Sequence, residues 1–168
     1  EEPPSIVRSP RWVKPIKAVF DMLGILPGYR EADVSMVFLL FFSVFFAMLI
    51  GDAGYGALFL IATILIRCKL PKAPAYPFTL FYVLSVCTII WGTLTANVFG
   101  IGPTEGQTWP LQITWLAEVN SMGVQANLMK FCFLLGAIHL TIAHVWNTIV
   151  IWPDKRALAQ AGWACMVW

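Results

Sequence analysis

The run from Val34 to Ile66 is the feature that most constrains the fold, because it carries no charge except that of Asp52. As one α-helix it would be about 50 Å long, well beyond the ~30 Å hydrocarbon core of a bilayer. The run must therefore tilt steeply as a single helix or break into two shorter ones. The stretch GDAGYG, which begins at Gly51, supplies the glycines at which a break is expected.

Basic residues on either side of this run favour two helices. Those before it include Lys14, Lys17 and Arg30, and those directly after it are Arg67, Lys69 and Lys72. Because basic residues collect on the cytoplasmic side of a membrane, both clusters face the cytoplasm only if the chain enters the bilayer and returns. The sequence therefore predicts a helical hairpin of residues 34–50 and 53–67, broken at GDAGYG.

Composition assigns the rest of the chain to the same class. The sequence is 59% hydrophobic and 12% charged, with a mean hydropathy of +0.75, whereas soluble domains carry roughly 25% charged residues. Further spans are expected at 78–98 and 128–152, with a truncated one at 157–168. The predicted fold is an all-α, polytopic helical membrane protein, in which a polar arm (1–33) precedes the membrane domain (34–168).

The loop after residue 98 differs in charge from the earlier connections. It contains Glu105, Glu118 and two tryptophans but no lysine or arginine, which is typical of a non-cytoplasmic interface. The sequence therefore predicts that residues 99–127 lie on the non-cytoplasmic side. The segment PDKR at 153–156 is expected to return to the cytoplasm.

Asp52 is the first candidate functional residue, since burying a charge at membrane depth costs about 2.5–3.5 kcal/mol even on insertion scales. Two interpretations are open. Asp52 can cap a helix by accepting from the amides of Gly54 or Tyr55, or it can face an aqueous cavity at the hairpin tip. Capping is the favoured interpretation, and asparagine is expected to perform that role about as well.

Two histidines are the other ionisable candidates within a predicted span. His139 and His144 are five residues apart, about 140° around a helix, so they cannot hold one metal ion as histidines four apart can. Polar packing is the favoured role, and a proton relay at His139 is the alternative. No metal, cofactor, catalytic triad or basic nucleic-acid surface is expected from the sequence.

Small residues mark two places where helices are expected to pack closely. One set is spaced by four residues, as on one face of a helix: Gly92, Ala96 and Gly100. The other set permits the tight backbone of a reversal: Gly51, Gly54 and Gly56. Both sets are expected to serve packing rather than ligand binding.

Five ordered motifs resemble the membrane domain of the large stator subunit of rotary V-type and A-type ATPases, called subunit a in eukaryotes and subunit I in prokaryotes. They are LPGYREADVS, FFAMLIGDAGYGALF, WGTLTANVFG, LGAIHLTIAHVWN and ALAQAGWACMVW. Tyr55 resembles the prokaryotic members, which differ here from the histidine of eukaryotic ones. Val34 and Ala96 stand where the family usually has proline and glycine.

This resemblance implies a non-catalytic fragment of a proton- or sodium-translocating complex. Family members form two half-channels beside a rotor ring, with an essential arginine on a later helix, and the chain is similar to the first half of that domain. Implied partners are the rotor-ring proteolipid subunits, other stator and peripheral-stalk subunits, and the lipid bilayer. The implied location is the plasma membrane of a prokaryote or the endomembranes of a eukaryote.

Two other classes of protein stay open at this point. Half of a secondary ion-coupled transporter is one, because helices broken at glycines build ion sites in transporters. A structural membrane assembly protein is the other. Inverted repeats would indicate a transporter, and none is found between residues 34–67 and 78–152.

Overall fold

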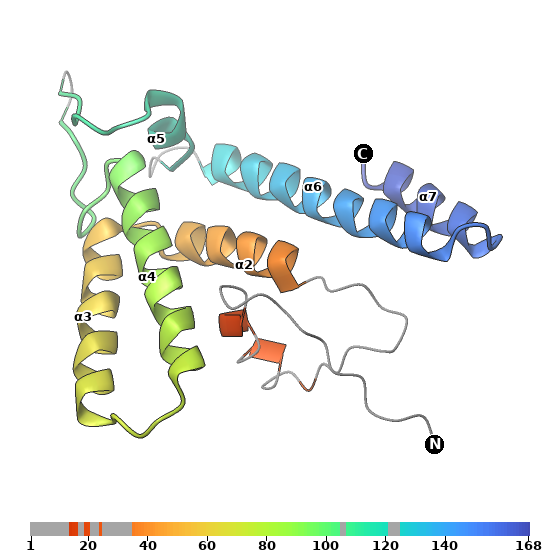
Figure 1. The fold of residues 1–168 in the computed structure, drawn as a ribbon. Coiled ribbons are helices and arrows are strands. Elements are labelled where there is room, and N and C mark those ends of the chain that lie inside the picture. The colour runs from red at the N-terminus through yellow and green to blue at the C-terminus, as the bar shows by residue number, and fades with distance from the viewer. Residues whose placement is uncertain (1–13, 17–18, 21–23, 25–34, 105–106, 121–124) are drawn as a thin grey trace. The chain divides into compact units, whose positions relative to one another are not determined.

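The computed structural model describes residues 14–16, 19–20, 24, 35–104, 107–120 and 125–168 (Figure 1). These residues form helices and loops, with one isolated bridge between Val98 and Ile101 and no strand among them. The all-helical fold predicted from the sequence is therefore confirmed. The chain divides into two compact units, Glu1–Ala117 and Glu118–Trp168.

The first unit contains three long apolar helices, α2 (Ser35–Ile50), α3 (Ala53–Lys69) and α4 (Ala75–Leu94). The break between α2 and α3 falls at Gly51 and Asp52, where the sequence predicts it. Gly51 has a left-handed φ of 64°, and its amide donates to the Ala47 carbonyl at 2.8 Å, which ends α2. Glycine adopts this conformation without the steric cost that a side chain would add.

The predicted hairpin of residues 34–50 and 53–67 is an open bend. The chain bends by 117° from α2 to α3, and the helices that lie side by side are α3 and α4 (Figure 1). α4 also packs against α2, so it contacts both arms of the bend. Sequence periodicity could not give this angle, because α2 and α3 are apolar around most of their circumference.

Part of the N-terminal arm joins the core of this unit. Most of residues 1–33 lie outside the described residues, but Ile16, at the end of the short helix η1 (Lys14–Ile16), and Val19 are buried. They pack with Leu39 of α2 and with two leucines of α4. The arm predicted as an aqueous segment therefore contributes apolar side chains to the membrane domain.

α4 ends at Leu94, four residues before the end of the span predicted at 78–98. Ala96 has a left-handed φ of 54° and donates its amide to the Thr93 carbonyl at 3.2 Å. The next amide, of Asn97, donates to the Gly92 carbonyl at 2.8 Å. This pair of hydrogen bonds is a Schellman motif, with alanine at the position that usually holds glycine.

The sequence predicts that Gly92, Ala96 and Gly100 lie on one face of a helix, and this prediction is wrong for Ala96 and Gly100. Gly92 lies within α4, whereas Ala96 and Gly100 lie in the loop that follows it. Their four-residue spacing has no meaning once the helix has ended. Gly100 has its own left-handed φ of 74°, which glycine tolerates.

α3 and α4 approach closely at two glycines. A Cβ atom on Gly92 would overlap the amide nitrogen of Ala53 and lie 2.6 Å from the carbonyl carbon of Asp52. A Cβ atom on Gly56 would lie 2.9 Å from the amide nitrogen of Ile89. Since these obstacles are backbone atoms, they cannot turn aside as a flexible side chain can.

The second unit is built on α6 (Gln125–Ile151) and α7 (Arg156–Met166), which pack along each other (Figure 1). The stretch predicted as a truncated span at 157–168 is therefore helical as far as Met166 and doubles back along α6. The short helix α5 (Thr114–Asn120) precedes this pair in the sequence.

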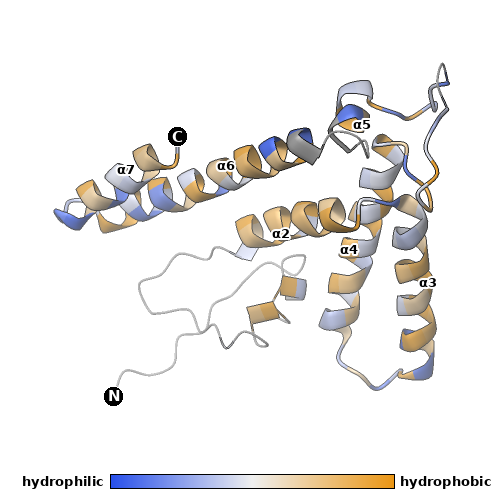
Figure 2. Ribbon diagram, turned by 180° about the vertical axis from the view of Figure 1, so that it is seen from behind, coloured by the Kyte–Doolittle hydropathy of each residue, from blue (hydrophilic) through white to orange (hydrophobic). Residues whose placement is uncertain are grey.

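Two of the described helices are long and apolar enough to cross a membrane: α4, and residues 127–151 of α6. α2 and α3 pass the same test together, as a bent pair. Apolar residues dominate α2, α3 and α4 in Figure 2. α4, with 20 residues, is about 30 Å long, which matches the hydrocarbon core.

We expect Gly92→Ala to lower the free energy of unfolding by roughly 1–3 kcal/mol, because the added methyl group must push the backbone of residues 52–53 away from α4. Gly136→Ala is the matched control, since a Cβ at this position of α6 meets no atom within 4 Å. Thermal unfolding of the purified full-length subunit measures both. Equal melting temperatures for the two variants would contradict the close approach of α3 and α4.

Candidate functional site

Asp52 caps the N-terminus of α3, as the sequence predicts. Its backbone is extended (φ −144°, ψ 125°), and its Oδ1 atom accepts hydrogen bonds from the amides of Gly54 at 2.7 Å and Tyr55 at 3.1 Å. These amides have no partner within the helix, so the side chain satisfies donors that would otherwise be unpaired. Asp52 is only 3% exposed, which excludes bulk water as its main partner.

The same carboxylate binds a second segment of the chain. The amide of Phe99 donates to Oδ1 at 2.9 Å, and the amide of Gly100 donates to Oδ2 at 2.7 Å. These donors are 47 and 48 residues further along the sequence than Asp52. One side chain therefore holds the start of α3 against the loop that follows α4.

Asn97 joins the same two segments from the other side. Its Nδ2 atom donates to the Gly51 carbonyl at 2.9 Å, and its own carbonyl accepts from the Ala53 amide at 2.9 Å. The sequence does not predict this role, because Asn97 falls inside the span predicted at 78–98. The signal that was available is its residue type, since asparagine is common in turns and uncommon within helices.

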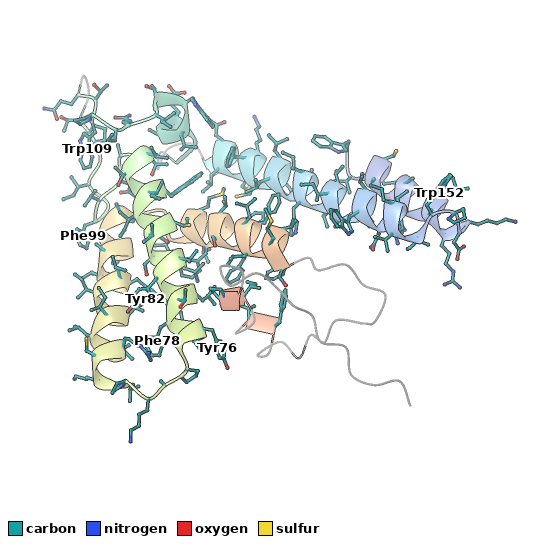
Figure 3. The ribbon with its side chains drawn as sticks, viewed as in Figure 1. Tyr76, Phe78, Tyr82, Phe99, Trp109 and Trp152 are labelled. Carbon is teal, nitrogen blue, oxygen red and sulfur yellow. The ribbon has the colours of Figure 1, made fainter. Side chains whose placement is uncertain are left out.

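Aromatic side chains cover this arrangement. The rings of Tyr55 and Phe99 pack edge to face with centroids 5.7 Å apart, and Figure 3 shows Phe99 beside the start of α3. A Cβ atom on Gly54 would lie 2.6 Å from the Phe99 ring, so a larger residue there would displace that ring from the start of α3. We call Gly51–Tyr55 together with Ala96–Gly100 the Asp52 cluster.

The loop within the Asp52 cluster is conformationally strained. Ala96 and Phe99 have φ values of 54° and 52°, in the left-handed region that costs a non-glycine residue roughly 1–2 kcal/mol. Such conformations persist only where neighbouring contacts determine them. Here the contacts are the hydrogen bonds from Phe99 and Gly100 to Asp52.

The amide donors of the cluster favour the ionised form of the carboxylate. Three amides point at Oδ1 and one at Oδ2. Hydrogen bonds from N–H groups to a charged acceptor are shorter and about twice as strong as neutral ones, and they replace the water that burial removes. The geometry is that of a structural carboxylate, because protonation would set a hydroxyl group against these donors.

The two candidate histidines lie on α6, in the second unit. His144 Nδ1 is 2.7 Å from Gln160 Oε1, a hydrogen bond that ties α6 to α7. Trp168, which follows α7, donates from Nε1 to Thr141 Oγ1 of α6 at 2.9 Å. His144 thus has the polar packing contact favoured from the sequence, and His139 lies half-buried on the same helix.

No set of three His, Cys, Asp or Glu side chains is gathered as metal ligands in the part of the chain that the structure describes. The Asp52 cluster is a set of amide donors already filled by a carboxylate of the same chain. What the arrangement can do chemically is fix two backbone segments to each other.

We expect Asp52→Asn to destabilise the cluster by about 1–3 kcal/mol, which revises the expectation that asparagine serves as well. Asparagine Oδ1 can still accept from Gly54 and Tyr55, but its Nδ2 would face the Gly100 amide, donor against donor. Amide hydrogen exchange should therefore accelerate at Gly100, whereas Gly54 and Phe99, which both donate to Oδ1, should keep more of their protection. Unchanged exchange at Gly100 would refute this assignment.

We expect a double-mutant cycle of His144→Ala and Gln160→Ala to give a coupling energy of about 0.6 kcal/mol, as is usual for hydrogen bonds between membrane helices. The measurement is the melting temperature, in lipid, of the full-length wild-type subunit, the two single variants and the double variant. Strictly additive effects would show that the two side chains do not interact.

Comparison with known proteins gives consistent relatives, although no family model matches the chain. The chain is 38% identical to the V-type ATP synthase subunit I of Borreliella burgdorferi over 89% of its length, and 35% identical to the V-type ATP synthase subunit I 1 of Treponema pallidum over 96%. It is 30% identical to the A-type ATP synthase subunit I of Methanocaldococcus jannaschii over 84%.

The chain spans only part of these relatives, namely 26%, 27% and 21% of their lengths. The similarity nevertheless covers most of the chain, including the broken helix and the loop of the Asp52 cluster. The five motifs, the apolar helices and these relatives agree, and the chain belongs to the subunit I family of V-type and A-type ATP synthases.

Proposed function

We propose that this chain is part of the membrane stator of a rotary V-type or A-type ATPase that translocates protons or sodium ions. In this role it helps to form the ion half-channels beside the rotor ring. The observation that carries the proposal is the 38% identity, over 89% of the chain, to a V-type ATP synthase subunit I. The same relatives support a stator over half of a secondary transporter.

The contribution of this part of the stator is to hold helices rather than to carry ions. The Asp52 carboxylate has amide donors on both oxygens, so it is unsuited to cycles of protonation and release. A fixed angle between α2 and the α3–α4 pair is what the Asp52 cluster provides. A stator needs such rigidity, because its channels must keep their position while the ring turns.

The proposal includes the setting of the chain. It is a non-catalytic, integral membrane subunit, and ATP chemistry belongs to other subunits of the complex. Its partners are the proteolipid subunits of the rotor ring, the other stator and peripheral-stalk subunits, and lipid. The membrane is the plasma membrane in a prokaryote or an endomembrane in a eukaryote.

The test uses the intact complex with the full-length subunit in sealed vesicles. We expect deletion of the subunit to abolish ATP-driven ion uptake and the full-length subunit to restore it. Asp52→Asn should lower the amount of assembled complex, yet leave ion uptake per assembled complex within about twofold, because the carboxylate is structural. Asp52→Leu should prevent assembly, since it leaves four amides without acceptors.

Asp154→Asn is the matched control for Asp52→Asn, since Asp154 is an exposed carboxylate that accepts from the amide of Arg156. It should leave both assembly and uptake unchanged. Normal assembly of Asp52→Asn without ion uptake would show that the charge itself takes part in transport. Undiminished uptake after deletion of the subunit would reject the stator function.

A further inference from the structure

The two ends of the α3–α4 pair differ in charge. At the turn between the helices, residues 67–77 contain three basic residues and no aspartate or glutamate. At the other end, residues 95–113 contain no lysine or arginine. With α4 long enough to cross the hydrocarbon core, these two ends reach opposite leaflets of the bilayer.

Aromatic side chains accompany both ends of the pair. Figure 3 shows Tyr76 and Phe78 at the turn, and Phe99 and Trp109 at the far end. Tyrosine and tryptophan concentrate at the headgroup level on both faces of a membrane. The basic residues, by contrast, are confined to the turn, which we call the basic turn (residues 67–77).

Arg67 fixes the shape of the basic turn. Its Nη1 atom donates to the Ala73 carbonyl at 2.7 Å, and its guanidinium carbon lies 5.1 Å from the centre of the Phe78 ring. The Leu70 carbonyl accepts from the Ala73 amide at 3.1 Å within the same turn. Arg67 is therefore already engaged by the protein and acts as a positioning residue.

Lys69 and Lys72 differ from Arg67 because their side chains are exposed. Lys69 is the last residue of α3, and Lys72 lies in the turn that Arg67 holds. The neighbouring Leu70 is also exposed, and Tyr76 is exposed on the first turn of α4. Ammonium groups beside an apolar and an aromatic side chain suit the boundary between headgroups and acyl chains.

We propose that the basic turn binds the phosphodiester headgroups of anionic lipids, with Lys69 and Lys72 contacting the phosphate. The occupant is lipid rather than free phosphate, because the turn lies at the start of α4, which is long enough to cross a membrane, and exposed apolar residues flank its lysines. This goes beyond the stator function, since it requires only that α4 cross the membrane.

The test places the intact complex in nanodiscs of phosphatidylcholine that contain a photo-crosslinking phosphatidylglycerol or a photo-crosslinking phosphatidylcholine. Adducts on residues 67–77 are counted by mass spectrometry. We expect more adducts from phosphatidylglycerol than from phosphatidylcholine. Lys69→Gln and Lys72→Gln should each lower the phosphatidylglycerol yield by about fivefold, the usual contribution of one basic residue at an anionic surface.

Lys130→Gln is the control, because it removes one exposed positive charge from α6 and leaves the basic turn intact. It should not change the yield of adducts on residues 67–77. Addition of millimolar inorganic phosphate should not change it either. The amount of assembled complex should equal that of the wild type for all three variants.

Three results would overturn the proposal. Equal adduct yields from the two lipids would show that the turn does not select anionic headgroups. Competition by inorganic phosphate would identify a phosphate site instead of a lipid surface. Cross-links from the turn to a neighbouring subunit in place of lipid would show that a protein covers it. None of these results depends on ion uptake, so they are separable from failure of the stator function.

Discussion

The hydrogen bonds from four backbone amides to the Asp52 carboxylate are the interaction on which the first unit depends. Two of them begin α3, and two hold the loop that follows α4 in a left-handed conformation. Glycine at position 92 allows α4 to approach the same backbone without obstruction. The buried Asp52 carboxylate therefore stabilises the start of α3 and the loop after α4, at the place where the two helices are in close contact. The apolar surroundings tolerate this buried charge because the backbone holds four amide donors in position around the carboxylate.

The sequence predicts the local parts of this arrangement well. An uncharged run too long for one span, interrupted by GDAGYG, indicates two helices and a cap at Asp52, and the structure has both. The contacts between residues far apart in the sequence could not be predicted from it. Nothing near Asp52 shows that Phe99 and Gly100 supply half of its donors, because hydrogen bonds across 47 residues leave no local pattern. The apolar sequence of WGTLTANVFG also hides the end of α4, where alanine replaces the glycine that usually signals a helix terminus.

The family assignment and the geometry inform each other. Over the aligned residues, relatives in bacteria and an archaeon are 30–38% identical to this chain, which identifies the family without saying what each residue does. The geometry separates Asp52, a buried carboxylate with amide donors on both oxygens, from groups able to exchange protons. An acidic residue within a membrane domain is a functional candidate by default, yet here the contacts indicate a structural one. His144, in contact with Gln160, follows the same pattern in the second unit.

The spacing between Asp52 and Gly100 also bears on how the membrane domain is made. When the residues of α3 are being joined to the growing chain, the segment that completes its N-terminal cap has not yet been synthesised, because Gly100 lies 48 residues beyond Asp52. Until then the carboxylate has only the amides of its own helix as partners, and the close-packed surface at Gly56 has no neighbour. Closing so long a loop costs only slightly more entropy than closing a short one. α3 and α4 are therefore suited to leave the translocation channel together. The hydrogen bonds of Asp52 join them at one end, and the hydrogen bond of Arg67 holds the turn between them at the other.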